Sequence, residues 1–256
     1  AGAGLVLGMG ILTRPDLGAL VLPVGLFWAV GRRPWSWLAR LTLPMMLVSG
    51  MVLAPWLFRN YQLHQRVLLT TDSAEALWLG NNARSTGTLW DRDGIAMARL
   101  AEQALVALPG PRTELGNHDW FMREALHWIR ENPTDAGRGF MKKLYFSWWF
   151  SPGYATRHYE WIPRPILWFY KALYGGLLIM ALVGAVTGLS STRPAIKRFA
   201  LVCAAAAGGF SLVHVLFHAE GRHRVVVMPI VAMLAACSLR RANGALSIWY
   251  NARGHD

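Results

Sequence analysis

Long apolar runs without a charged side chain alternate with short basic segments along this chain, and one polar stretch interrupts them. A helix that crosses a bilayer needs about 20 apolar residues, because each residue adds about 1.5 Å. Three runs of 18 to 21 residues reach this range, and interfacial residues extend two runs of 15 residues. The pattern therefore predicts six membrane-spanning helices, the first of which is truncated. The runs are Ala1–Thr13, Leu17–Gly31, Leu41–Phe58, Ala172–Thr192, Phe199–Ala219 and Val225–Leu239.

The polar stretch from Phe58 to Arg164 has helical periodicity of its own, so we predict that it is a folded helical insert rather than a disordered loop. Asn117–Asn132 is amphipathic and ends before Pro133. A second amphipathic stretch covers Thr134–Phe150, and a weaker helix is expected within Asp91–Leu108. No β-strand pattern of any length is present in the sequence. The apolar stripe predicted for the first of these helices consists of Phe121, Ala125, Leu126, Trp128 and Ile129.

The aromatic end of the second stretch, Tyr145–Phe150, leaves two interpretations open. A helix that lies on lipid head groups needs such a surface. The same residues also suit the core of a small domain outside the membrane. Lys142 and Lys143 precede them and are expected to be solvated charges.

Composition agrees with a membrane protein. Hydrophobic residues make up 54% of the chain and charged residues 16%, against roughly 25% charged in an ordinary soluble domain. The formal net charge is +12, but the insert holds 13 basic and 11 acidic residues and is almost neutral. The excess positive charge therefore sits among the apolar runs, which is typical of loops at a membrane and excludes a nucleic-acid-binding surface.

The basic residues of the short loops predict the orientation, because Lys and Arg collect on the cytoplasmic side. Nine lie in one set of loops and three in the opposite set. The insert then faces outward, into the periplasm if the host is a bacterium. The nine are Arg32, Arg33, Arg40, Arg193, Lys197, Arg198, Arg240, Arg241 and Arg253, and the three are Arg14, Arg222 and Arg224.

The two cysteines carry no predicted disulfide. Cys203 and Cys237 both lie within predicted spans, so neither is available to the insert. We interpret them as small apolar residues in helix packing.

Four segments together resemble known sequences. Ala54–Tyr61 closes the third predicted span, and Leu77–Asn82 with Thr86-Gly87 follows it. Arg123–Phe150 and the late Arg222–Arg224 come next, the latter leading into Pro229. Their order, spacing and outward placement resemble bacterial family 39 glycosyltransferases, the GT-C membrane enzymes that include protein mannosyltransferases.

The resemblance implies an all-α polytopic membrane protein of the GT-C type. Spans 1–3 would cover residues 1–57, an extracytoplasmic helical domain residues 58–164, spans 4–6 residues 165–241 and a cytoplasmic tail residues 242–256. Such an enzyme moves a sugar from a polyprenyl-phosphate donor to a glycan, lipid or protein acceptor at the outer face of the inner (plasma) membrane. The match covers only the carboxyl-terminal part of such an enzyme.

The family's catalytic acidic residues lie in an early outer loop, which no segment here matches. We therefore expect them upstream of Ala1, and we expect this fragment to be inactive alone. Asp16 sits in an outer turn but resembles a mid-chain turn of the family, so it is not assigned as the base. The family's late Arg-Tyr-Arg motif has His223 at its centre here, and Pro229 is the one proline that remains of its usual two.

Candidate binding residues follow from this placement. Arginine binds phosphate with two parallel hydrogen bonds, so Arg222, Arg224 and Arg59 are candidates for the lipid phosphate, although arginines at span ends also snorkel to head groups. Asn60, Tyr61 and Asn81 are candidates for contacts with the substrate. Gly80-Asn81 is equally a turn signal.

The histidines near the end of the fifth run have a spacing that metal ligands can have. His214 and His218 are four residues apart on one helical face, and Glu220 and His223 follow. This set could bind zinc, but histidines near a span end more often serve packing, so no metal or cofactor is predicted.

Two other functions remain alternatives. A non-catalytic module of envelope polysaccharide assembly would have the same spans but no acidic pair in the upstream loop. A transporter places ionisable groups near the bilayer midplane, whereas the charged residues here lie at the ends of the spans.

Overall fold

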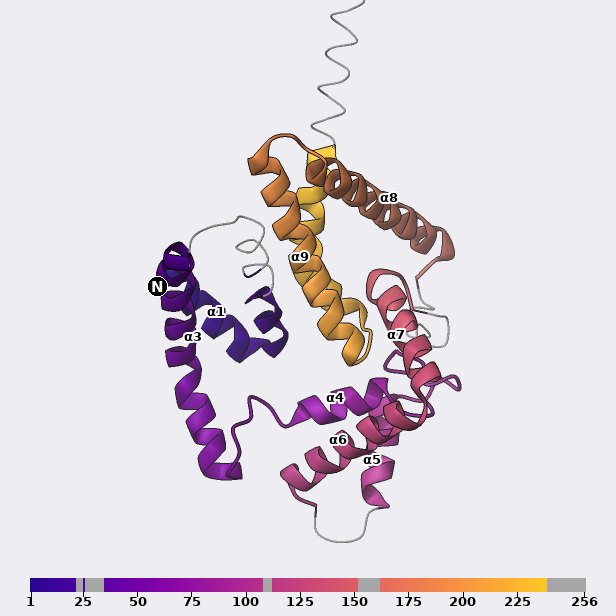
Figure 1. The fold of residues 1–256 in the computed structure, drawn as a ribbon. Coiled ribbons are helices and arrows are strands. Elements are labelled where there is room, and N and C mark those ends of the chain that lie inside the picture. The colour runs from indigo at the N-terminus through magenta and orange to yellow at the C-terminus, as the bar shows by residue number, and fades with distance from the viewer. Residues whose placement is uncertain (22–24, 26–34, 108–111, 152–161, 239–256) are drawn as a thin grey trace, which may run out of the picture. The chain divides into compact units, whose positions relative to one another are not determined.

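The computed structural model describes residues 1–21, 25, 35–107, 112–151 and 162–238 (Figure 1). Within these residues every regular element is a helix, and the one pairing of extended backbone is an isolated bridge between Trp90 and Ala96. The elements are α1 (Gly2–Thr13), η1 (Pro15–Leu20), α3 (Trp35–His64), α4 (Asp72–Gly80), α5 (Met97–Val106), α6 (Glu114–Glu131), α7 (Pro133–Trp148), α8 (Arg164–Leu189), α9 (Pro194–Leu216) and η4 (Gly221–Val227). Residues 228–238 are also helical.

Three described helices are long and apolar enough to cross a membrane. They are Thr42–His64 within α3, with a mean hydropathy of 1.3, and α8 and α9, each with 2.0. They correspond to the third, fourth and fifth apolar runs of the sequence. Gly2–Thr13 and His223–Ser238 are shorter apolar helices. Most of the predicted second span, Leu17–Gly31, lies outside the described residues.

The chain divides into two compact units. The first contains residues 1–18, 34–159 and 210–224, and the second contains residues 19–33, 160–209 and 225–256. The first is called the outer unit below, after the side of the membrane that the sequence predicts for the insert. The insert therefore shares a unit with α1 and α3. Helix α3 also continues without a break past residue 58, where the predicted insert begins, to His64.

Helices α1 and α3 of the outer unit meet through small residues. A side chain on Gly4 would collide with the main chain of Met45, and one on Gly8 would lie within 3.1 Å of the backbone of Ser49. The Ser49 hydroxyl donates to the Gly4 carbonyl at 2.8 Å. Glycine lets the two backbones approach, and the serine then satisfies its hydroxyl between them, as in membrane helix pairs.

Helices of the second unit also meet through small residues. A side chain on Gly184 of α8 would overlap the carbonyl of Leu234, and one on Gly188 would lie 2.6 Å from Cβ of Ala200 on α9. The other side of α8 is apolar and exposed, which in water would be unfavourable but suits lipid. The exposed apolar side chains are Ile166, Trp168, Phe169, Tyr170, Leu173, Ile179, Leu182, Val183 and Val186.

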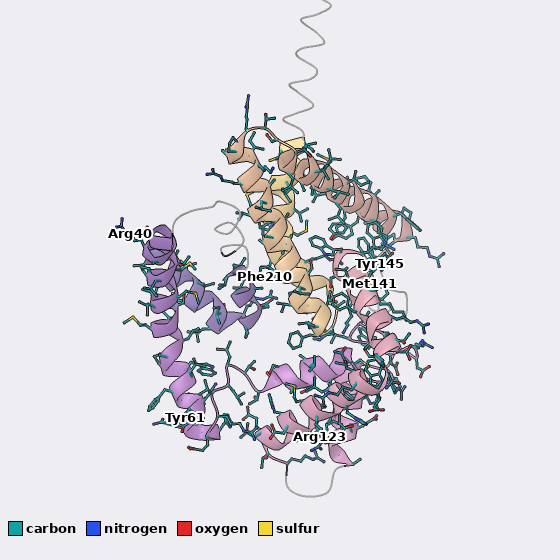
Figure 2. All side chains as sticks on the ribbon, in the orientation of Figure 1. Arg40, Tyr61, Arg123, Met141, Tyr145 and Phe210 are labelled. Carbon is teal, nitrogen blue, oxygen red and sulfur yellow. The ribbon has the colours of Figure 1, made fainter. Side chains whose placement is uncertain are left out.

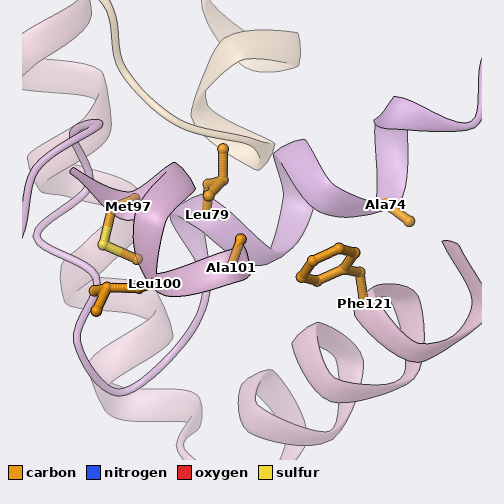
Figure 3. Packing of buried hydrophobic residues seen from close by; sticks show 6 residues of the cluster. All are labelled: Ala74, Leu79, Met97, Leu100, Ala101 and Phe121. Atoms are coloured by element: carbon orange, nitrogen blue, oxygen red, sulfur yellow. The ribbon is translucent and has the colours of Figure 1, made fainter. Parts of the chain in front are cut away.

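Three helices of the insert bury a small core (Figure 3). Phe121 of α6 is 1% exposed and lies against α4, while Ala125 of α6 is fully buried. Leu126, which the predicted stripe included, is 39% exposed, so that part of the prediction is wrong. The stripe is narrower because a single flank of α6 meets α4. The buried cluster consists of Ala74, Leu79, Met97, Leu100, Ala101 and Phe121.

The loop between α4 and α5 is organised by a buried carboxylate. Asp91 is 1% exposed, and its Oδ1 accepts from the backbone N–H groups of Asp93 and Ile95 at 3.0 and 2.8 Å. Its other oxygen binds the guanidinium of Arg84. Burial alone raises the pKa of the Asp91 carboxyl, but the hydrogen bonds from Ile95, Arg84 and Asp93 together hold that pKa below its ordinary value.

We expect Asp91→Ala to destabilise the protein by about 3 kcal/mol, because two backbone N–H groups and one guanidinium lose their acceptor. The pKa of Asp91 is lower in the folded state, so its contribution is complete above the unfolded pKa and is lost as the pH falls toward the folded value. Denaturant unfolding in detergent between pH 7 and pH 3 measures both effects. The neighbouring Asp93 is 75% exposed, so Asp93→Asn should change stability by less than about 0.5 kcal/mol. Equal losses in the two variants would contradict this account.

Candidate functional site

An apolar hollow with one guanidinium at its border lies between α1 and α3 in the outer unit. Its volume is about 440 Å³, and it is lined by Leu12, Val52, Pro55, Trp56 and Arg59. Four of these five residues are apolar. The hollow therefore suits a ligand that has an apolar chain and an anionic group.

Two neighbours orient Arg59 at the border of this hollow. Its guanidinium carbon lies 5.0 Å from the ring centre of Trp56, and its Nη1 donates to Oδ1 of Asn60 at 3.2 Å. Such a cation–π contact restrains an exposed arginine without removing its charge. The guanidinium has five N–H donors in a fixed plane, so the bond to Asn60 leaves it able to contact phosphate oxygens.

The structure places the predicted substrate contacts Asn60 and Tyr61 at the carboxyl end of α3. Asn60 is 5% exposed, and its amide nitrogen donates to the carbonyl of Leu68 at 2.8 Å, which ties the helix to the following loop. Tyr61 is 47% exposed (Figure 2). Asn60 thus has a structural bond, while Tyr61 is accessible; a sugar contact by either one stays a prediction.

Asn81, the third predicted substrate contact, belongs to a buried hydrogen-bonded cluster at the end of α4. Its amide nitrogen donates to the carbonyls of Leu77 and Leu216 at 2.7 and 2.8 Å, and its oxygen accepts from Nζ of Lys143 at 2.9 Å. Asn81 thereby joins α4, α7 and the end of α9. Its role as a substrate contact likewise stays a prediction.

Lys143 corrects one expectation from the sequence. It was expected to be solvated like Lys142, but it is 2% exposed, whereas Lys142 is exposed. Besides Asn81, its Nζ donates to the carbonyls of Gly80 and Phe217, each at 3.3 Å. All three of these acceptors are neutral, and burial lowers the pKa of the Lys143 amine to about 8.

The turn after α1 contacts α9 through a group of three ionisable side chains. Both oxygens of Asp16 accept from Arg14, at 3.2 and 2.8 Å, and Oδ2 lies 3.2 Å from Nε2 of His214. The side chain of Asp16 is 13% exposed. These contacts hold the turn after α1 beside the end of α9, and whether Asp16 acts as a base is not decided by them.

The histidine rings at the end of α9 form a stack. The ring centre of His214 lies 4.1 Å from that of His223, with an angle of 10° between the ring planes, and 6.2 Å from that of Phe210. Nε2 of His218 and Nε2 of His223 lie 4.0 and 3.8 Å from Oε2 of Glu220. Two imidazoles thus lie around one carboxylate oxygen.

Arg224 follows this group directly. Its Nη1 donates to the carbonyl of Trp149 at 3.3 Å, and its guanidinium carbon lies 5.2 Å from the ring centre of Phe150. These contacts bring the late motif next to the carboxyl end of α7. The side chain of Arg222 lies outside the described residues.

Sequence reasoning missed the hydrogen-bonded cluster around Lys143 and the pairing of Asp16 with His214. The partners are 62 to 198 positions apart, so helical periodicity does not bring them together. One signal for Lys143 was available: two adjacent lysines occur in a helix that needs an apolar face. The comparisons of the chain with known protein families, with curated proteins and with solved structures found no match.

Proposed function

We propose that this protein is a membrane glycosyltransferase that moves a sugar from a polyprenyl-phosphate donor to an acceptor at the outer face of the membrane. The apolar hollow that ends on Arg59 carries the proposal. A polyprenyl phosphate has a long hydrocarbon chain and a phosphate, so it needs an apolar surface beside a fixed cation. The resemblance to family 39 glycosyltransferases supports the same assignment.

The contacts of the outer unit support placing the insert on the same side of the membrane as the Arg14 turn and the turn after α9. The predicted orientation puts the Arg14 turn, the insert and the turn after α9 on one side of the membrane. Asp16 contacts His214, Lys143 contacts the carbonyl of Phe217, and Arg224 contacts that of Trp149. Segments that share one face of a membrane can make such contacts, whereas segments on opposite faces cannot.

In the proposed reaction an acceptor hydroxyl attacks the anomeric carbon, and the bond between that carbon and the phosphate oxygen breaks. The polyprenyl phosphate leaves with the bonding electrons and gains negative charge. Arg59 and Arg224 would stabilise that charge by hydrogen bonds. None of the described residues is assigned as the base that takes the hydroxyl proton.

Removal of the Arg59 guanidinium is the test. We expect Arg59→Ala to weaken binding of undecaprenyl phosphate roughly 10- to 100-fold, because a charge-assisted hydrogen bond contributes about 1.5–3 kcal/mol. Arg59→Lys should lie between wild type and Arg59→Ala, since lysine keeps the charge but not the planar donor pair. Titration of the full-length protein in nanodiscs, followed by native mass spectrometry, measures the affinity.

Arg123 provides the matched control. It is on α6 (Figure 2), its side chain is 69% exposed, and it is not among the residues that line the hollow. Arg123→Ala should bind undecaprenyl phosphate as wild type does, and undecaprenol should show no dependence on Arg59. If wild type and Arg59→Ala bind undecaprenyl phosphate equally well, the assignment of the donor site to Arg59 is wrong. Transfer from labelled polyprenyl-phosphate sugars by the full-length protein then tests the reaction itself.

A further inference from the structure

Three potential metal ligands lie within one short turn of the outer unit. His218 follows α9, Glu220 comes two residues later, and His223 is in η4. Each offers one ligand atom, and these three atoms all lie within 4.8 Å of one another. Six residues of chain thus bring two imidazoles and a carboxylate together.

The distances are close to those of a metal centre. Oε2 of Glu220 lies 4.0 Å from Nε2 of His218 and 3.8 Å from Nε2 of His223. Ligands of a tetrahedral zinc ion at about 2.0–2.1 Å are about 3.3 Å apart. The two distances from Oε2 of Glu220 exceed this spacing by about 0.7 and 0.5 Å, so modest side-chain adjustments bring the three residues toward ligand spacing.

The three ligands are largely removed from water. The side chains of His218, Glu220 and His223 are 11%, 24% and 14% exposed. Two imidazoles and one carboxylate are donors that a divalent transition-metal ion binds well. Their burial limits competition from water for the same ion.

The surroundings hold the turn in place. The N–H of His223 donates to the carbonyl of Glu220 at 3.1 Å, and the N–H of Ala219 donates to that of Gly87 at 2.8 Å. The ring of His223 is stacked on His214, which lies against Asp16. A metal site needs this support, because ligand orientation depends on the groups around the ligands.

We propose that His218, Glu220 and His223 bind a divalent transition-metal ion, and that zinc is the ion that their donor set suits best. Two histidines and one glutamate are a known zinc ligand set, with a fourth position open to water or another ligand. Imidazole also binds other late first-row ions, whereas magnesium and calcium prefer oxygen ligands.

A metal at this position would cross-link the end of α9 to η4. The residue after His223 is Arg224, whose guanidinium lies at Trp149 and Phe150. Fixing the backbone at His223 also fixes the start of the next side chain. The metal site would therefore position Arg224, independently of whether Arg224 contacts a lipid phosphate.

Metal binding can be measured directly on the full chain, purified in detergent with a tag that contains no histidine. After removal of metals with a chelator, we expect the protein to bind about one zinc ion per chain, as mass spectrometry of the element reports. Titration with Co²⁺ should give visible ligand-field bands of a low-symmetry nitrogen and oxygen site, which zinc then abolishes.

Substitution assigns the ligands. His218→Asn, Glu220→Gln and His223→Asn should each weaken zinc binding by more than the roughly 10- to 100-fold that loss of an outer-shell partner costs. His127 is exposed on α6, so His127→Asn should bind zinc as wild type does. Zinc binding that survives all three substitutions would overturn the assignment.

Metal binding by the wild-type protein tests the proposal even if a variant fails to fold. Absence of stoichiometric zinc and of Co²⁺ bands in folded wild-type protein would mean that His218, Glu220 and His223 contact one another without a metal ion. That outcome also overturns the proposal. Donor-lipid binding is measured separately, so the two proposals can fail independently.

Discussion

Gly80→Ala is expected to prevent the outer unit from forming its native contacts, at a cost of at least about 3 kcal/mol. Gly80 is buried at the end of α4, and a Cβ atom there would overlap the carbonyl group of Phe217. It would also lie 3.2 Å from the backbone nitrogen of His218. All three of these atoms belong to the main chain, so no side chain can rotate away to relieve the overlap.

Gly137 offers a control of the same chemistry. It is within α7, and a Cβ atom there would meet nothing within 4 Å. Alanine has a higher helix propensity than glycine, so Gly137→Ala should stabilise the protein by about 0.5–1 kcal/mol. The thermal midpoint and the fraction of monodisperse protein after extraction measure both variants. A Gly80→Ala variant as stable as wild type would show that α4 and Phe217 are not in contact.

We expect Lys143→Met to cause the second large loss of stability, and the pH dependence of that loss identifies its cause. Methionine keeps most of the aliphatic volume but leaves the oxygens of Gly80, Asn81 and Phe217 without their shared donor. Unsatisfied buried acceptors cost about 1–3 kcal/mol each, against which the variant regains the cost of burying an ammonium group. We expect a net loss of about 3 kcal/mol at pH 8.

The sign of the pH dependence follows from the lowered pKa. Lys143 has a pKa of about 8 in the folded protein, below its ordinary value of 10.5. Between these values the unfolded state binds more protons, so the stability of wild type rises with pH across that window. Relative to Lys143→Met, wild type should gain up to about 3 kcal/mol between pH 8 and pH 10.5.

Denaturant unfolding at a series of pH values measures this difference. Lys142 is the adjacent control, because its side chain is exposed and its loss should change stability by less than about 0.5 kcal/mol at any pH. If the difference between wild type and Lys143→Met stays constant from pH 8 to pH 10.5, the amine is not buried as described.

The apolar runs predicted the long helices well, because a sequence that must satisfy its backbone in lipid has few other structures available. The runs 41–58, 172–192 and 199–219 fall on α3, α8 and α9. Pro133 also marks the boundary between α6 and α7, as a residue without a backbone N–H does at the start of a helix.

The candidate site was less predictable, because its geometry depends on contacts between distant segments. Lys142 and Lys143 are neighbours with the same side chain, yet only the second points at the end of α4. Asp16 and His214 are nearly 200 positions apart. The spacing of the histidines indicated that they share a face, but Glu220 and His223 join His218 through a turn that helical periodicity does not describe.

Helix α3 has one more consequence. Only 6% of its most apolar window is buried by the described part of this chain. Whatever hydrocarbon or neighbouring protein surrounds it in the bilayer must complete its solvation. The surroundings of the hollow at Arg59 therefore depend partly on the host membrane. A detergent micelle thinner than that membrane will change the hollow before it changes the insert.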